Sequence, residues 1–180
     1  MKMFSKAMMG AVLVFLTWDY PVLAEDSQPA AFKIGNVEFL ADEPSYLDFG
    51  AGAFDIVHSE ISAAGYIEYR YGKKLSFIGP VMGIMANTDG GVFGYGGIYT
   101  NIKYRRLVAT PFFTVGGYHQ GGSKDLGGTF QFRSGITFAY QFDKGSRLGV
   151  RFAHISNASI HDNNPGENEL LLTYSLPLAF

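Results

Sequence analysis

The feature of this sequence that most constrains its fold is an alternation of apolar and small or polar residues along most of the chain. Between Gly127 and Phe142 the even-numbered positions are mainly aromatic or aliphatic, whereas the odd-numbered ones carry glutamine, arginine, glycine, threonine and alanine. Successive side chains of a β-strand point to opposite faces, so this pattern predicts a strand with one apolar face. The same period runs through residues 61–71 and 148–156.

Eight segments of this kind are predicted, separated by turn-rich stretches. They lie near residues 45–56, 61–71, 75–87, 91–102, 106–118, 127–142, 147–157 and 168–180. Strands of about 10–13 residues are longer than the ~5–6 usual in soluble sheets, and they suit tilted membrane strands, which need ~9–11. The longest apolar run, residues 7–16, is too short for the ~20 residues of a membrane-spanning helix.

Two kinds of barrel fit this pattern. A lipocalin-like soluble barrel has its apolar face inside, whereas an outer-membrane barrel has its apolar face outside and a polar interior. The polar face here is rich in small residues, as suits a narrow interior, and a terminal strand ending in Phe180 resembles the insertion signal of outer-membrane barrels. The sequence therefore favours an all-β, eight-stranded antiparallel transmembrane β-barrel. The charged residues of the polar face are expected to pair in the lumen, namely Glu68, Arg70, Arg133, Arg151 and Glu169.

The N-terminus has the pattern of an export signal. Lys2 and Lys6 precede an apolar run, and small residues at 22–24 form a cleavage site. We expect residues 1–24 to be a signal peptide and 25–180 to be the barrel domain, beginning with a polar stretch to about residue 44. A net charge of −2 argues against nucleic acid as a partner. The expected location is the outer membrane of a Gram-negative bacterium.

Three polar residues interrupt the predicted lipid-facing surface. His154 and Ser156 are two apart and share the apolar face of their strand, and Asn168 has the outward parity of the next strand. The connection between these strands, residues 157–167, is then an external loop. A hydroxyl near an imidazole that a third polar group orients is the arrangement of an activated nucleophile. The alternative interpretation is that all three are polar residues at headgroup height.

The residues from His154 to Ala158, followed by the Asn164-Pro165-Gly166 turn and a terminal strand, resemble the lipid A 3-O-deacylase (PagL) family of outer-membrane barrels. The resemblance is close over about residues 152–177. It implies hydrolysis of the 3-O-linked acyl ester of lipid A in the outer leaflet, with Ser156 as nucleophile, His154 as general base and no cofactor or metal. It also implies an oxyanion role for Asn157 and a possible homodimer.

The third catalytic position departs from the family pattern. The family has a glutamate two residues after the turn glycine, where this chain has Asn168. Glu167 and Glu169 flank this position with the opposite parity, and a bulge would be needed to bring either one round. An asparagine can orient a histidine but cannot offer the imidazolium a full charge. We therefore expect the same chemistry at a lower rate, with the third member open among Asn168, Glu167 and Glu169.

The alternatives to a deacylase are a lipid acyltransferase, which shares the acyl-enzyme, and a non-catalytic structural or adhesion barrel. A passive channel fits less well, because side chains fill an eight-stranded interior. His58, His119 and His161 fall in turn-like regions and are expected to be solvated.

Overall fold

The computed structural model describes residues 29–57 and 61–178. The predicted signal peptide, residues 1–24, lies outside the described residues. In the described residues no helix is long and apolar enough to cross a membrane. The strands there are β1 (Ala30–Ile34), β2 (Val37–Leu40), β3 (Ser45–Phe54), β4 (Ser62–Arg70), β5 (Gly79–Asn87), β6 (Val92–Tyr99), β7 (Ile102–Tyr104), β8 (Leu107–His119), β9 (Phe130–Gln141), β10 (Arg147–Ser156) and β11 (Glu167–Leu178).

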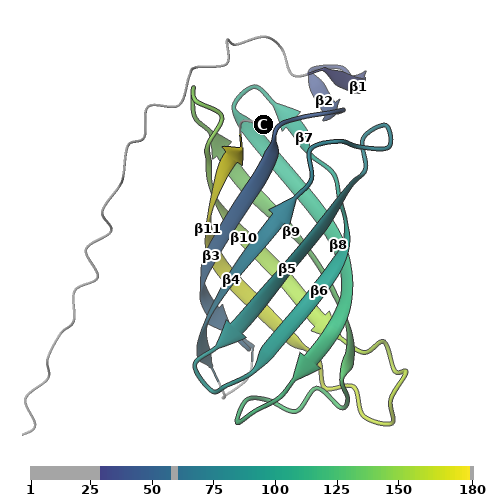
Figure 1. Ribbon diagram of the computed structural model, residues 1–180, viewed down its shortest axis with the longest axis vertical. Coiled ribbons are helices and arrows are strands. Elements are labelled where there is room, and N and C mark those ends of the chain that lie inside the picture. Colours follow the sequence, from purple (N-terminus) through teal and green to yellow (C-terminus); the bar gives the residue numbers. More distant parts are fainter. Residues whose placement is uncertain (1–28, 58–60, 179–180) are drawn as a thin grey trace, which may run out of the picture.

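Eight of the described strands close into an antiparallel barrel (Figure 1). Each of them pairs with its neighbour in the order β3, β4, β5, β6, β8, β9, β10 and β11, and β11 pairs back onto β3. Every predicted segment overlaps one of these strands, so the predicted fold class is confirmed. Closure leaves no free edge in the barrel wall.

The two faces of the wall have the polarity of a membrane barrel. In β10 the outward side chains of Leu148, Val150 and Phe152 are 43–48% exposed, whereas Arg147 and Arg151 are at most 1% exposed. The same alternation runs through β4, where Glu68 and Arg70 alternate with outward residues. A soluble barrel would bury the apolar face instead. The lipocalin-like alternative is therefore wrong, and the exposed apolar wall faces lipid.

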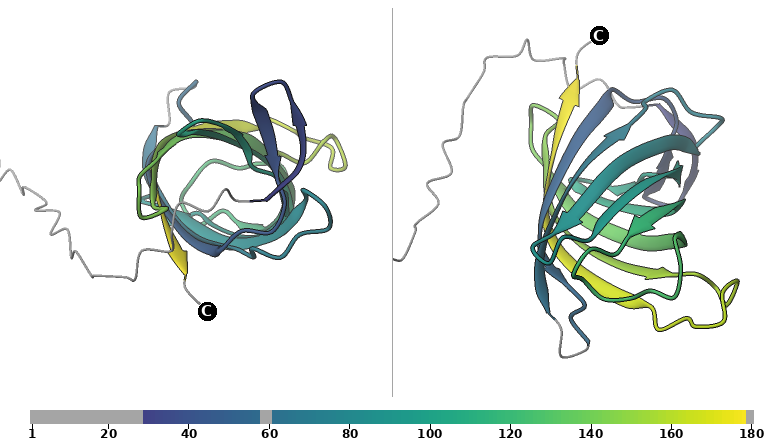
Figure 2. Two further views of the ribbon diagram at one scale, coloured as in Figure 1. Left: turned by 90° about the horizontal axis from the view of Figure 1, so that it is seen from above. Right: turned by 60° about the horizontal axis from the view of Figure 1, so that its bottom comes forward.

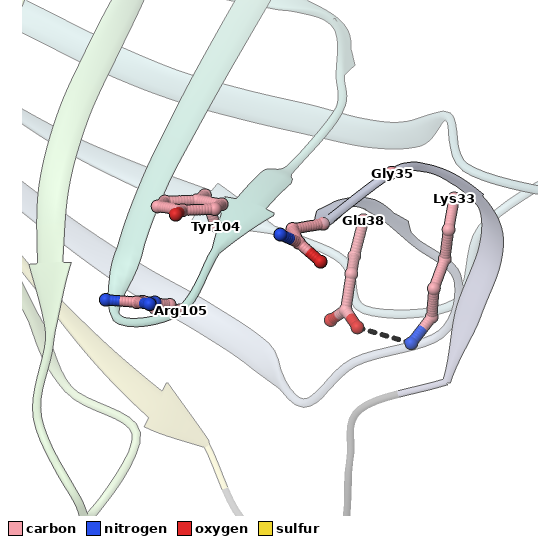
Figure 3. Close-up of a pocket in the computed structure, with 6 residues that line it drawn as sticks. Lys33, Gly35, Glu38, Tyr104 and Arg105 are labelled. Atoms are coloured by element: carbon pink, nitrogen blue, oxygen red, sulfur yellow. Dashed lines mark hydrogen bonds and ion pairs between the residues drawn. The ribbon is translucent and has the colours of Figure 1, made fainter.

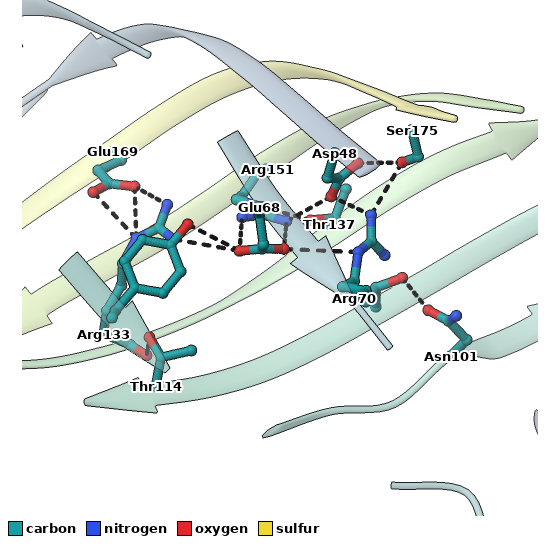
Figure 4. Close-up of polar contacts among 12 residues, drawn as sticks. Asp48, Glu68, Arg70, Asn101, Thr114, Arg133, Thr137, Arg151, Glu169 and Ser175 are labelled. Carbon is teal, nitrogen blue, oxygen red and sulfur yellow. Dashed lines mark hydrogen bonds and ion pairs between the residues drawn. The ribbon is translucent and has the colours of Figure 1, made fainter. Parts of the chain in front are cut away.

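The charged residues of the inner face pair with one another in the lumen, as predicted (Figure 4). The guanidinium of Arg151 donates hydrogen bonds to both carboxylate oxygens of Glu68, each at 3.0 Å. Arg133 donates to Glu169 at 2.6 Å, and Arg70 pairs with Asp48. These pairs link β10 to β4, β9 to β11 and β4 to β3, so the interior is a packed polar core.

Three short strands lie outside the barrel and were not predicted. β1 and β2 form a hairpin in the stretch expected to be merely polar, and β7 joins this hairpin to β8. Runs of three to five residues are too short to show a clear period. Three predicted strand boundaries also shift: the segment expected at 75–87 begins at Gly79, the one expected at 91–102 ends at Tyr99, and the one expected at 127–142 begins at Phe130.

The hairpin and the last residues of β11 lie at the same end of the barrel (Figure 2). In outer-membrane barrels with an even number of strands this end faces the periplasm. The connection between β10 and β11, residues 157–166, lies at the opposite end, which is the external one in such barrels. The loop thus lies at the end opposite the C-terminal end of β11, as predicted, and its external position stays a prediction.

Candidate active site

His154 lies on the lipid-facing wall near the external rim. Its strand, β10, puts odd-numbered residues into the lumen and even-numbered ones outward, so His154 follows Phe152 on the outer surface. It is half-buried. A polar ring on this wall is tolerated because the cost of polar groups falls toward the membrane interfaces.

Asn168 orients the His154 ring. The two residues lie directly opposite each other in the pairing of β10 with β11, and His154 Nδ1 lies 3.1 Å from Asn168 Oδ1. With the proton on Nδ1, the ring donates to this oxygen and leaves Nε2 free to act as a base. The alternation of inward and outward positions therefore correctly predicted Asn168 as the residue that contacts His154.

Gly166 packs against the other edge of the ring. Its φ is +60°, and a Cβ at this position would come within 3.0 Å of His154 Cε1 and 3.3 Å of Nε2. Both the left-handed backbone and the close approach favour glycine. The turn glycine therefore leaves the space that the imidazole occupies.

Ser156 lies one outward position beyond His154 on β10. It is half-buried, and within residues 29–57 and 61–178 its hydroxyl makes no hydrogen bond to His154 or to any other group. Hydrogen bonds between catalytic groups are often loose without substrate and tighten in the reactive complex. Two and three residues further along, Ala158 and Ser159 have φ of 51° and 60° and turn the chain sharply away from the strand.

Neither flanking glutamate reaches His154. β11 pairs with β10 in unbroken register, so Glu167 and Glu169 stay on the lumen side with the opposite parity to Asn168. Glu169 is bound by Arg133, and Glu167 accepts a hydrogen bond from the Asp55 amide at 3.2 Å. The bulge that would have brought either carboxylate to the histidine is not present in β11, which leaves Asn168 as the third residue of the cluster.

Asn157 points into the barrel and holds the external loops together. It is fully buried, and its side-chain amide donates to the carbonyls of Leu126 at 2.9 Å and Asn163 at 2.7 Å. Its backbone amide donates to Asn164 Oδ1 at 3.0 Å. In this arrangement Asn157 has no donor left for an oxyanion, so the role expected from the resemblance stays a prediction without geometric support.

Sequence reasoning missed Ser134. This exposed residue of β9 lies directly opposite His154 on the lipid-facing wall, on the side away from Asn168. Parity alone puts Ser134 outward, but finding its neighbour requires the register between β9 and β10. The Asp143-Lys144-Gly145 turn sets that register, yet its residues fit several hairpin geometries.

The remaining histidines take no part in the cluster. His119 is exposed at the end of β8, as expected, and His58 lies outside the described residues. The expectation of a solvated His161 is wrong in part. Its Nε2 atom is buried with no hydrogen-bond partner among the described residues, and its ring packs where a Cβ on Gly128 would lie.

The fold and this cluster define an outer-membrane β-barrel with a histidine-centred site on its lipid-facing surface. The family model "Lipid A 3-O-deacylase (PagL)" matches residues 43–177, which is most of the chain. The chain therefore belongs to the lipid A 3-O-deacylase family, whose name denotes a hydrolase.

The chain is also similar to one sequence relative and to one solved structure. A lipid A deacylase PagL from Bordetella bronchiseptica is 38% identical over 52 residues, a match that spans 29% of this chain and 29% of the relative. The crystal structure of the outer membrane enzyme PagL superimposes with a TM-score of 0.56 and 18% identity, covering 74% of this chain and 99% of that one. At this identity the structural likeness shows the fold.

Proposed function

We propose that this protein hydrolyses the 3-O-linked acyl chain of lipid A in the outer leaflet, using Ser156 as the nucleophile and His154 as the general base. The observation that carries the proposal is the oriented imidazole on the lipid-facing wall, with Asn168 at Nδ1 and Ser156 one outward position away. The family name supports the choice of lipid A as substrate. Possible homodimer formation stays a prediction.

The chemistry follows from these positions. Nε2 of His154 takes the proton of the Ser156 hydroxyl while Oγ forms a bond to the acyl carbonyl carbon. The tetrahedral intermediate collapses, the bond to the 3-oxygen of the sugar breaks, and the imidazolium returns its proton to that oxygen. Water then attacks the acyl-enzyme with His154 again as base, which releases the fatty acid and restores the serine. Asn168 keeps the ring in the required tautomer throughout.

The position of the site fits a lipid substrate. Lipid A lies in the outer leaflet, and the site lies on the outer wall at the external rim, so substrate reaches it by lateral diffusion. An aqueous cleft is therefore unnecessary. The neighbouring wall is apolar, with Phe152 and Leu170 each 46% exposed, and these side chains offer an acyl chain a surface to pack against.

The test is mass spectrometry of lipid A from cells that express the protein, together with assay of the released fatty acid. We expect loss of one 3-linked acyl chain with the unaltered protein and none with Ser156→Ala. Ser159→Ala, which removes a hydroxyl from the adjacent loop, is the matched control and should keep activity. Unaltered lipid A with the parent protein, or equal activity in Ser156→Ala, would refute the proposal. Transfer of the acyl chain to another lipid without free fatty acid would indicate an acyltransferase.

A further inference from the structure

The β1–β2 hairpin at the periplasmic rim has two chemically different faces. Lys33 and Glu38 lie opposite each other and form an ion pair on one face (Figure 3). The other face is apolar: the rings of Phe32 and Phe39 stack with their centroids 4.2 Å apart, and Ile34 is 65% exposed. A two-stranded ribbon is marginally stable alone, so this apolar face needs a partner surface.

The apolar face of the hairpin continues into the lipid-facing wall of the barrel. Residues directly opposite each other in a sheet share a face. An unbroken row of such pairs runs across five strands, from β1 to β9: Phe32, Phe39, Ile102, Ala109 and Phe138. Phe138 is 61% exposed on the barrel's outer wall. The adjacent row contains Lys33, Glu38 and Lys103 and continues to Val108, which faces the lumen.

The turn between β4 and β5 extends the same apolar surface. The Phe77 ring packs edge-on against Phe32 and Phe39, with centroid distances of 5.2 and 5.9 Å. Beside it Leu75 is 87% exposed and Ile78 is 39% exposed. Hairpin and turn therefore form one apolar ledge, defined here as Phe32, Ile34, Phe39, Leu75 and Phe77, at the rim of the barrel.

The ledge is fixed to the barrel, which gives its apolar face a defined direction. Glu43, in the link from β2 to β3, is buried and accepts hydrogen bonds from Arg147 at 2.6 Å and Asn101 at 2.6 Å, and it pairs with Lys74. Burial alone would raise the pKa of the Glu43 carboxyl, but the charges of Arg147 and Lys74 outweigh it and lower that pKa. The carboxylate is therefore ionised at neutral pH and holds the link in place.

We propose that the β1–β2 hairpin lies in the periplasmic leaflet of the outer membrane, with its apolar ledge against phospholipid acyl chains and its Lys33–Glu38 face toward the periplasm. Continuity with the lipid-facing wall selects this occupant over a protein partner. The hairpin, residues 30–40, precedes the segment matched by the family, which begins at residue 43, so the proposal is independent of the deacylase activity.

The test uses single tryptophans. Trp18 is the chain's only tryptophan, so in the Trp18→Phe background each introduced residue is the sole tryptophan, which is excited selectively over tyrosine. Ile34→Trp reports on the ledge, Lys33→Trp on the opposite face of the same strand, and Phe138→Trp on the established lipid-facing wall. Each variant is reconstituted in phosphatidylethanolamine and phosphatidylglycerol vesicles and titrated with brominated phospholipid and with aqueous iodide.

We expect brominated lipid to quench Ile34→Trp nearly as strongly as Phe138→Trp, by about two-fold or more, as for side chains ~5–10 Å into the boundary region. Lys33→Trp should respond mainly to iodide. Equal iodide quenching of Ile34→Trp and Lys33→Trp would overturn the proposal, because the hairpin would then lie in water. Protection of Ile34→Trp from both quenchers would also overturn it, because the ledge would then contact protein.

Discussion

At the scale of single residues, the residue at position 168 determines how strongly the site can stabilise a protonated His154 ring. In this chain it is Asn168. Its Oδ1 lies 3.1 Å from His154 Nδ1, which suffices to fix the ring and its tautomer. In the proposed mechanism, a neutral amide offers no charge to the imidazolium that forms when His154 takes the Ser156 proton. Hydrogen bonds to charged groups contribute about 1.5–3 kcal/mol and neutral ones about 0.5–1.5 kcal/mol, so a carboxylate here should stabilise the transition state more.

We therefore expect Asn168→Glu to deacylate lipid A about ten-fold faster than the parent, because ~1.4 kcal/mol of transition-state stabilisation corresponds to a factor of ten. Initial rates in mixed micelles would measure the effect. Asn168→Gln is the matched control, since it has the same length without the charge and should not exceed the parent rate. If the glutamate variant is no faster than the glutamine variant, charge at this position does not limit the reaction.

Residue parity explains how much of this site could be predicted from the sequence. An unbroken alternation in β10 and β11 is enough to bring His154 and Asn168 to the same surface and to turn Glu167 and Glu169 away. Parity does not give register, so the neighbour on β9, Ser134, could not be found. The inward turn of Asn157 and its partners in a distant loop also depend on tertiary contacts that a local pattern does not contain.

At the scale of elements, the position of the last residues of β10 depends on two external loops that are joined by hydrogen bonds. Asn157 directly follows β10 and lies in the loop between β10 and β11. Its side-chain amide donates one hydrogen bond to Leu126, in the loop between β8 and β9, and another to Asn163, in its own loop. Gly127, with φ +81°, comes so close that a Cβ there would lie 1.9 Å from the Asn163 carbonyl oxygen. The loops therefore hold the end of β10, where Ser156 lies.

We expect Asn157→Leu to lower deacylation strongly and to open the external loops to proteolysis, because a buried acceptor without its donor costs about 1–3 kcal/mol. Limited proteolysis of the folded barrel, followed by mass spectrometry of the cleavage sites, would measure this opening. Asn163→Ala, at an exposed position whose backbone carbonyl is kept, should match the parent. Lost activity in Asn157→Leu with unchanged cleavage would instead favour the oxyanion role.

The elements that the sequence did not reveal are the ones that lack a repeated pattern. The barrel strands are 8–13 residues long and show several cycles of alternation, whereas β1, β2 and β7 have three to five residues each. Their face assignment depends on pairing with β8, which only the fold supplies. The apolar face of the hairpin nevertheless lies on the same side of the sheet as the lipid-facing surface of the barrel, as the proposed membrane position requires.

At the scale of the whole molecule, the barrel balances an apolar exterior with a charge-paired interior. At its centre Arg151 donates to Glu68, Asp48 and Thr137, and its guanidinium lies over the rings of Tyr66 and Phe112. All of these side chains are buried in the lumen. Removing one residue of an ion pair leaves its partner's charge buried and uncompensated in the lumen, where water solvates it poorly. Removing both residues of the pair leaves no such charge.

Arg151→Met should therefore destabilise the barrel by about 3–5 kcal/mol, the usual cost of breaking a buried ion pair. Urea unfolding in detergent micelles, followed by the loss of the folded band in unheated gels, measures the effect. Val150→Met changes the adjacent, lipid-facing residue and should leave stability nearly unchanged, since that wall accepts any apolar side chain. Adding Glu68→Gln to Arg151→Met restores the charge balance and should recover part of the loss. A single variant as stable as Val150→Met, or a double variant weaker than the single one, would mean that packing of the lumen rather than charge pairing stabilises this barrel.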